Sequence, residues 1–195
     1  MKVRDSGMPE EEYWESLLDV PLILDRMQIG ASLDHVVELG CGYGTFTLPV
    51  ARRIRGTLDT FDISADMIRR TSERASEAGV SNIRLHLRDV LQDGFGLPDD
   101  SSDAVLLFNI LHTENPAALL SEAARVLRPG GVLQVIHWRH DPATPRGPSL
   151  DIRPRPEQIV SWAMQAGRLA CRGDAIDLPP WHYGCVFVRT GGPAT

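Results

Sequence analysis

Three glycines that follow a short apolar run are the part of this sequence whose residue types and spacing could do chemistry. Gly40, Gly42 and Gly44 come directly after residues 36–39, a run typical of a buried strand. Because glycine tolerates positive φ and close backbone approach, a strand can turn here into a helix around a ligand. Exposed N–H groups at the start of that helix favour an electronegative ligand. The spacing predicts a ligand-binding loop, with a tight turn that binds nothing as the alternative.

Three acidic side chains lie at or near the ends of successive apolar runs. Glu38 lies inside the first run, Asp62 ends the run 57–61, and Asp89 follows the run 83–87. A carboxylate in an apolar strand is costly unless it has a partner. Asp62 lies about 20 positions beyond the first glycine, a separation at which an acid can bind both hydroxyls of a ribose. We therefore expect these three acids to surround one ligand site.

The segments that must position these residues alternate between strand and helix. Strands are predicted at 36–39, 57–61, 83–87, 104–109 and 132–137, and helices at 46–54, 65–78, 116–127 and 157–166. Apolar runs separated by helices are typical of a parallel sheet that is covered on both faces. Residues 10–22 predict two short helices, because Pro21 interrupts their apolar face. The pattern indicates an α/β fold.

Taken together, residues 36–138 resemble the class I S-adenosylmethionine-dependent methyltransferases, and the rest of the chain does so more weakly. Glu38, Gly40, Gly42 and Gly44 match the family's first motif, acid-x-Gly-x-Gly-x-Gly. The resemblance implies a Rossmann-like, seven-stranded, mostly parallel sheet with helices on both faces and an antiparallel last strand. The remaining matched segments are 127–131, like the turn before the family's fifth strand, and 169–176 and 183–189, like its last two strands.

The resemblance also implies the cofactor, S-adenosylmethionine, with S-adenosylhomocysteine as product. In the family the glycine loop wraps the methionine part of the cofactor, and the acid matched by Asp62 holds the ribose hydroxyls. Within the loop, Cys41 is a small space-filler or, as the alternative, a reactive thiol. The other matched positions are Ile63 and Met67 near the adenine, Asp89 and Val90 at its amino group, and Asn109 and Leu111 beside the methionine and sulfonium.

Candidate acceptor residues follow the fourth and fifth predicted strands, where open α/β sheets bind ligands. Methyl transfer is an in-line displacement at an activated carbon, so the protein mainly orients the reactants. A base is required only if the acceptor must lose a proton. We predict His112 and His137 as catalytic residues and Trp138 and Arg139 as substrate-binding residues. For His112, a helix-entry histidine bonded to the backbone is an equally good interpretation.

Two turn-rich stretches, 1–14 and 141–156, are predicted to close over the site and to form a small acceptor pocket. The first ends in Tyr13 and Trp14, which we place against the substrate and the cofactor respectively. The alternative is a helix that merely packs on the sheet. Further candidates with bland alternatives are the loop arginines Arg146, Arg153 and Arg155, for an anionic acceptor or for solvent, and residues 181–183, for an aromatic wall or for packing.

The composition bounds the partners. The chain has 195 residues, 43% hydrophobic content and a formal net charge of -6, enough for one domain with a sizeable core. We divide the single domain 1–195 into an N-terminal arm with helices (1–33), a cofactor-binding core (34–140) and a final loop, helix and two strands (141–195). Without a basic stripe, a leader or an 18-residue apolar span, we expect a cytoplasmic protein that binds neither nucleic acid nor membrane.

The residue spacing also separates the function classes. Cys41, Cys171 and Cys185 show no metal or disulfide spacing, and the histidines form no i, i+4 pair, so we expect no metal. A nicotinamide-dependent oxidoreductase needs glycine where Thr45 stands, and a P-loop needs Gly-Lys-Ser/Thr. The expectation is a methyltransferase acting on a small molecule, as a monomer or homodimer, with the acceptor atom open. A non-catalytic S-adenosylmethionine-binding module is the main alternative.

Overall fold

Strand β4 (Ser102–Phe108) is buried along its whole length. In the computed structural model, which describes residues 8–191, Val105 and Leu107 pack into one apolar cluster, whereas Leu106 packs into another. Successive side chains of a strand point to opposite faces, so this continuous apolar run fits a sheet that is covered on both sides. Each fully buried leucine contributes about 1.5–3 kcal/mol to the free energy of folding.

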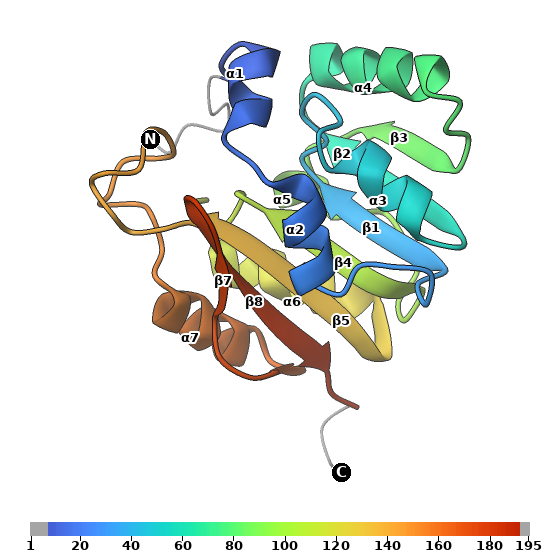
Figure 1. Ribbon diagram of the computed structural model, residues 1–195. Coiled ribbons are helices and arrows are strands. Elements are labelled where there is room, and N and C mark those ends of the chain that lie inside the picture. The colour runs from blue at the N-terminus through green and yellow to red at the C-terminus, as the bar shows by residue number, and fades with distance from the viewer. Residues whose placement is uncertain (1–7, 192–195) are drawn as a thin grey trace.

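Five parallel strands form the centre of the sheet, in the order β3-β2-β1-β4-β5. Their bounds are β1 (His35–Leu39), β2 (Thr57–Asp62), β3 (Ile83–Leu87), β4 as above and β5 (Leu127–Trp138). The strand order reverses between β1 and β4, and open α/β sheets bind ligands at such a point, outside the carboxyl ends of the strands. Figure 1 shows the first helix and the loop after β5 on that side of the molecule. The predicted parallel core is confirmed.

Helices cover both faces of this sheet. Their bounds are α1 (Glu11–Ser16), α2 (Val20–Arg26), α3 (Thr47–Arg53), α4 (Ala65–Glu77), α5 (Val90–Asp93), α6 (Pro116–Val126) and α7 (Pro156–Ala166). Helices α2 and α3 pack on the face of Leu106, and α6 and α7 pack on the face of Leu107 (Figure 1). The predicted break at Pro21 is confirmed, because this proline lies in the first turn of α2. Among the described residues, no helix combines the length and apolar content needed to cross a bilayer.

The end of the chain differs from the prediction in one detail. The strand expected over 169–176 is two short strands, β6 (Leu169–Cys171) and β7 (Ile176–Leu178). Both pair antiparallel with β8 (His182–Arg189), which in turn pairs antiparallel with β5. Gly173, with φ +79°, lies in the interruption, and a left-handed residue does not continue a strand. Of the predicted N-terminal arm, residues 1–7 lie outside the described residues.

Candidate functional site

The loop after β1 requires glycine at two of its three glycine positions. Gly40 and Gly44 have φ values of +86° and +80°. A Cβ on Gly40 would lie 2.9 Å from Cδ1 of Ile110, and one on Gly44 would lie 2.7 Å from Cδ1 of Leu48. The Gly40 N–H donates to the carbonyl of Phe61 at 2.7 Å. The loop is therefore packed tightly against the end of β2, the residue Ile110 after β4 and helix α3.

Glu38 lies beneath this loop and is only 2% exposed. The hydroxyls of Thr47 and Thr60 donate to its Oε2 at 2.7 and 2.8 Å. Burial raises the pKa of Glu38 to about 7, and the two hydroxyl donors oppose that rise. The partner that a buried carboxylate needs is thus a pair of threonines. Through them Glu38 ties β1 to β2 and α3 directly below the loop.

Asp62, at the end of β2, contacts the loop directly. Its Oδ2 accepts a hydrogen bond from the Gly42 N–H at 3.1 Å and lies 3.6 Å from the Cys41 sulfur, and its Oδ1 accepts from the Ser64 N–H at 2.9 Å. Each carboxylate oxygen can accept more than one hydrogen bond, so Asp62 can also bind ligand hydroxyls. Burial raises the pKa of the Cys41 thiol, which favours a space-filling role over a reactive one.

Apolar side chains next to the ends of β2 and β3 are open to solvent. Ile63 is 49% exposed and Leu91 is 43% exposed, whereas Met67 is half-buried and Val90 is buried. Asp89 is the N-cap of α5. A cavity of about 300 Å³ is lined in part by Val90 and Leu91. Exposed apolar side chains beside polar groups mark a binding surface, and their place beyond β2 and β3 suits a flat apolar group such as a base.

Helix α1 covers the glycine loop and is held there by charge. Arg70 and Arg74 of α4 pair with Glu11 and Glu15 of α1, each at 2.7 Å. Arg74 also donates to the carbonyl of Tyr43 in the loop at 2.9 Å. Exposed pairs of this kind each contribute about 0.2–1 kcal/mol. The contacts therefore form a weak latch between α1, α4 and the loop.

Trp138, at the end of β5, is the side chain on which the covering segments meet. Trp14 packs against it edge to face with ring centroids 6.0 Å apart, and His182 lies on it at 4.1 Å. A Cβ on Gly147 would lie 2.9 Å from Cγ of Trp138, so the loop after β5 presses on the indole. Tyr13, in contrast, is 45% exposed. The predicted substrate residues Trp138 and Tyr13 therefore lie in different surroundings, one enclosed and one open.

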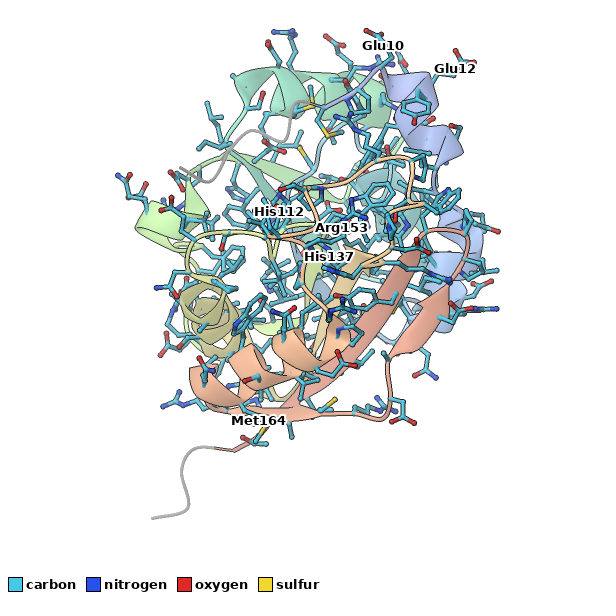
Figure 2. All side chains as sticks on the ribbon, turned by 90° about the vertical axis from the view of Figure 1, so that its left-hand side faces the viewer. Glu10, Glu12, His112, His137, Arg153 and Met164 are labelled. Atoms are coloured by element: carbon cyan, nitrogen blue, oxygen red, sulfur yellow. The ribbon has the colours of Figure 1, made fainter. Side chains whose placement is uncertain are left out.

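His112 and His137 are brought together, with ring centroids 5.6 Å apart. Figure 2 shows both beside Arg153 in the interior, whereas Met164 lies at the far end of the molecule. His137 is fully buried, and neither of its ring nitrogens has a hydrogen-bond partner within residues 8–191. Burial, and next the nearby His112, lower its pKa well below the ordinary value. A backbone interaction with Trp138 opposes this lowering. His137 therefore favours the neutral form and keeps hydrogen-bonding capacity for a ligand.

Two polar residues lie near Trp138: Asn109, predicted from the sequence beside the methionine and sulfonium, and His182, predicted only as part of an aromatic wall or of the packing. Asn109, at φ +59°, places its Nδ2 3.4 Å from Nε2 of His182. In the described part of the chain, Oδ1 of Asn109 and Nδ1 of His182 have no hydrogen-bond partner. Burial, then the charges of Arg139 and Arg153, lower the pKa of His182 to about 3. The signal for His182 is its register opposite Trp138 across β5 and β8, which no local pattern reveals.

The two arginines beside these histidines have different partners. Arg139 donates to the carbonyl of His182 at 3.1 Å and pairs with Asp177 of β7, so its guanidinium is already engaged. Arg153 is 7% exposed and donates only to backbone carbonyls of the loop after β5. No group of three or more His, Cys, Asp or Glu side chains among the described residues is arranged to hold a metal ion.

Comparison with known proteins gives a consistent picture. Residues 36–131 match a family described as a methyltransferase domain. The probable methyltransferase ltbC of Aspergillus luteorubrus is 29% identical over 81% of this chain and 56% of that protein. A SAM dependent methyltransferase from Aquifex aeolicus has the same fold, with a TM-score of 0.80 at 18% identity over 93% of this chain and 94% of that chain.

A third similarity concerns an enzyme named for ribosomal RNA. The 23S rRNA (uracil(1939)-C(5))-methyltransferase RlmD of Alcanivorax borkumensis is 30% identical over 64% of this chain. This chain spans only 27% of the length of that protein and 56% of the length of ltbC. One of these names specifies an acceptor and the other does not. The family match over 36–131 contains the glycine loop and the strand-end acids.

Proposed function

Since the chain belongs to the class I S-adenosylmethionine-dependent methyltransferase superfamily, we propose that it transfers a methyl group from S-adenosylmethionine to a small-molecule acceptor. One observation carries this proposal. The glycine loop after β1 and the carboxylate of Asp62 after β2 are hydrogen-bonded to each other beside the point where the strand order reverses. That is where open α/β sheets bind nucleotide-like ligands.

The cofactor residues take distinct roles in this proposal. The glycine loop, with Gly40, Cys41, Gly42 and Gly44, is assigned to the methionine part. The buried Glu38 supports the loop through Thr47 and Thr60. The remaining contacts are assigned to Asp62 at the ribose hydroxyls, Ile63, Met67, Asp89 and Val90 at the adenine, Asn109 at the methionine part and Trp14 above the cofactor.

When bound, the cofactor supplies a methyl group activated by its sulfonium. The chain's own residues then orient the acceptor and exclude water. His112 and His137 lie on the acceptor side with the enclosed Trp138 and, nearer the surface, Tyr13. Arg139 is assigned to the same side, and its guanidinium pairs with Asp177. The neutral imidazole of His137 can accept a hydrogen bond, or a proton, from an acceptor.

Charge and enclosure favour a small acceptor over RNA. The formal net charge of the chain is -6, whereas RNA binding relies on basic surfaces that neutralise phosphates. The arginines nearest the site, Arg139 and Arg153, are bonded to Asp177 and to the loop's own carbonyls. Trp14 and Gly147 also enclose the Trp138 indole, and this enclosure favours a small acceptor.

The test is ligand-dependent stability followed by turnover. S-adenosylmethionine and S-adenosylhomocysteine should raise the Tm, whereas NAD should not, and at a hundredfold excess over Kd the gain is about 2.7 kcal/mol. A shift with NAD alone, or with none of the three, would contradict the cofactor assignment. Binding without S-adenosylhomocysteine formation on a broad panel of small acceptors would instead favour a non-catalytic binding module.

Asp62 provides the matched variants for this test. Charge-assisted hydrogen bonds are each worth about 1.5–3 kcal/mol, so Asp62→Ala should weaken S-adenosylhomocysteine binding at least tenfold in calorimetry. Asp62→Asn should have a smaller effect, because one acceptor oxygen remains. Equal affinity for both variants and the original chain would remove Asp62 from the cofactor site.

A further inference from the structure

The loop of residues 139–155, called here the strap, is folded around one buried arginine. All three nitrogens of the Arg153 guanidinium donate to carbonyls of Arg139, Asp141, Arg146 and Pro148, at 2.7–3.4 Å. Proline has no backbone N–H, and the strap contains four prolines within 139–155. Arg153 thus supplies hydrogen-bond donors that the strap's own backbone lacks.

The charge of Arg153 is not neutralised by an ion pair. In the described part of the chain its guanidinium donates only to backbone carbonyls, and burial lowers the pKa of the arginine. Asp141 is the acid whose charge acts on it from a distance. A buried cation without a partner is costly. A position where the protein tolerates it is a candidate for a functional electrostatic role.

That charge acts on two imidazoles, one at the end of β5 and one at the start of β8. His137 and His182 are both buried and carry ring nitrogens that no group in the described chain contacts by hydrogen bond. For each of them burial is the main cause of a lowered pKa, and Arg153 adds to the lowering. Other charged or titratable groups acting on them are His112 and Arg139. The acceptor side of the site therefore combines neutral imidazoles with net positive charge.

We propose that Arg153 positions the strap over the acceptor and, through its unneutralised charge, selects an oxygen acceptor that loses its proton during transfer, such as a phenol or an enol. This inference rests on the proposed methyltransferase function. A hydroxyl can donate to an unpartnered ring nitrogen of His137 and release its proton there, whereas a carboxylate has no proton to donate. Positive charge disfavours a protonated amine and stabilises a developing phenolate.

The chemical step balances with this assignment. The acceptor's O–H proton passes to a nitrogen of His137 as the oxygen bonds the methyl carbon. The carbon–sulfur bond breaks in the same step, and its electron pair stays on sulfur to give the neutral thioether product. The imidazolium of His137, destabilised by burial and by the charge of Arg153, then releases the proton to solvent. Arg153 acts through the strap and through His137, so it is a positioning residue.

We call the hydrogen bonds from Arg153 to the strap carbonyls the clasp. The experiment compares Arg153→Met, which removes both the clasp and the charge, with Arg153→Lys, which keeps the charge but cannot bond several carbonyls at once. Arg155→Met is the matched control, because Arg155 is two residues away and exposed. Phenol and benzylamine serve as probes on the full chain saturated with S-adenosylhomocysteine. Probe affinity is read by ligand-observed NMR, and the histidine protonation is read from ring NMR signals across a pH titration.

Phenol should bind the original chain and the Arg155→Met variant, and at least tenfold more weakly the Arg153→Met variant. Benzylamine should bind detectably only after Arg153→Met. Arg153→Met should also raise the pKa of His137 and His182, while Arg153→Lys should leave both pKa values low. If Arg153 only held the strap in place, the two variants would not differ in these pKa values. Benzylamine binding the original chain as well as phenol does, or neither probe binding, would overturn the proposal.

The ring titration is independent of turnover and is repeated without cofactor. Failure of S-adenosylhomocysteine to bind would contradict the proposed function, and unchanged histidine pKa values in Arg153→Met would contradict only the role of Arg153. The ring signals of His35 and His86, which lie elsewhere, should not respond to either probe.

Discussion

The chain contains two groups of histidines that face opposite electrostatic situations. In the first, called the paired cluster, Asp59 accepts from Nε2 of His35 at 2.7 Å and from Nε2 of His86 at 2.6 Å. In the second, called the unpaired cluster, both ring nitrogens of His137 and Nδ1 of His182 have no hydrogen-bond partner in the described chain. Both clusters consist of histidines, and the difference between them is the carboxylate of Asp59, which only the paired cluster contains.

The paired cluster is charged by its own geometry. Nδ1 of His35 lies 2.7 Å from the carbonyl of Ser101, and its Nε2 lies 2.7 Å from Asp59. Both partners only accept hydrogen bonds, so His35 is satisfied only as an imidazolium. The hydrogen bond to Asp59 raises the pKa of His35 accordingly. Buried polar groups in structural parts of a protein usually have all their hydrogen-bond partners. A buried group that lacks a partner is therefore a candidate for binding a ligand.

The largest expected effect is on the paired cluster. Asp59→Ala removes the acceptor of Nε2 in both His35 and His86, and loss of these partly buried, charge-assisted hydrogen bonds costs about 1.5–3 kcal/mol. Chemical denaturation should show this loss in the free energy of unfolding. Asp59→Asn keeps one acceptor oxygen and should lose less. A loss below about 1 kcal/mol for Asp59→Ala would mean that the paired cluster does not stabilise the fold.

The second prediction reverses the sign for the unpaired cluster. His137→Leu replaces an incompletely bonded polar group by an apolar one, so stability should stay equal or rise slightly. Methyl transfer to a hydroxyl acceptor should fall about 100-fold, the usual size of a general-base contribution. His86→Gln is the control, with reduced stability and unchanged turnover. Marked destabilisation by His137→Leu, without a rate effect, would make His137 structural.

The third prediction uses pH to separate the clusters. The folded pKa of His35 is raised above its ordinary 6.5, so its stabilisation is complete below about pH 6.5 and is lost as the pH rises through the folded value. The folded pKa values of His137 and His182 are lowered, so only the unfolded chain takes up their protons as the pH falls below about 6.5. Each then removes about 1.4 kcal/mol per pH unit.

Measurement of this prediction requires differences between variants, since Glu38 also titrates in the fold near pH 7. Unfolding free energies of the original chain and of His35→Gln should converge as the pH rises from 6 to 9. His137→Leu should gain on the original chain as the pH falls from 7 to 5. Parallel curves for either pair would show that the corresponding histidine does not change its protonation on folding.

The sequence predicted the parts of this molecule whose evidence is local. Residue types and spacing within a few positions were enough to predict the glycine loop, the acid Asp62 and the helix break at Pro21. Asp59 was hidden because it lies within a run read only as a strand, and its partners come from β1 and β3. The roles of His182 and Arg153 depend on strand register and on burial of the strap. Those properties arise only when distant segments pack.

The smallest expected effect is a change in hydrogen-exchange protection of the segments around the two clusters when ligand binds. The segments that cover the unpaired cluster, 8–19 and 139–155, are held by the weak latch at Arg74 and by the clasp at Arg153. Both should gain hydrogen-exchange protection when S-adenosylhomocysteine binds, because a lid that excludes water closes with its ligand. Strands β2 and β3 around the paired cluster are already paired within the sheet, so their hydrogen-exchange protection should not increase.

Variants at the Arg74–Glu15 ion pair and at Arg153 test this last comparison. Glu15→Gln removes one exposed ion pair, which is worth at most about 1 kcal/mol and is screened by salt, so S-adenosylhomocysteine affinity should fall less than about fivefold, and the deficit should vanish at high salt. Arg153→Lys should speed exchange in 139–155 alone. If the glycine loop gains protection on binding while both covering segments exchange as before, then they are not lids. The free nitrogens of His137 would then have to be reached by a ligand without any movement of the strap.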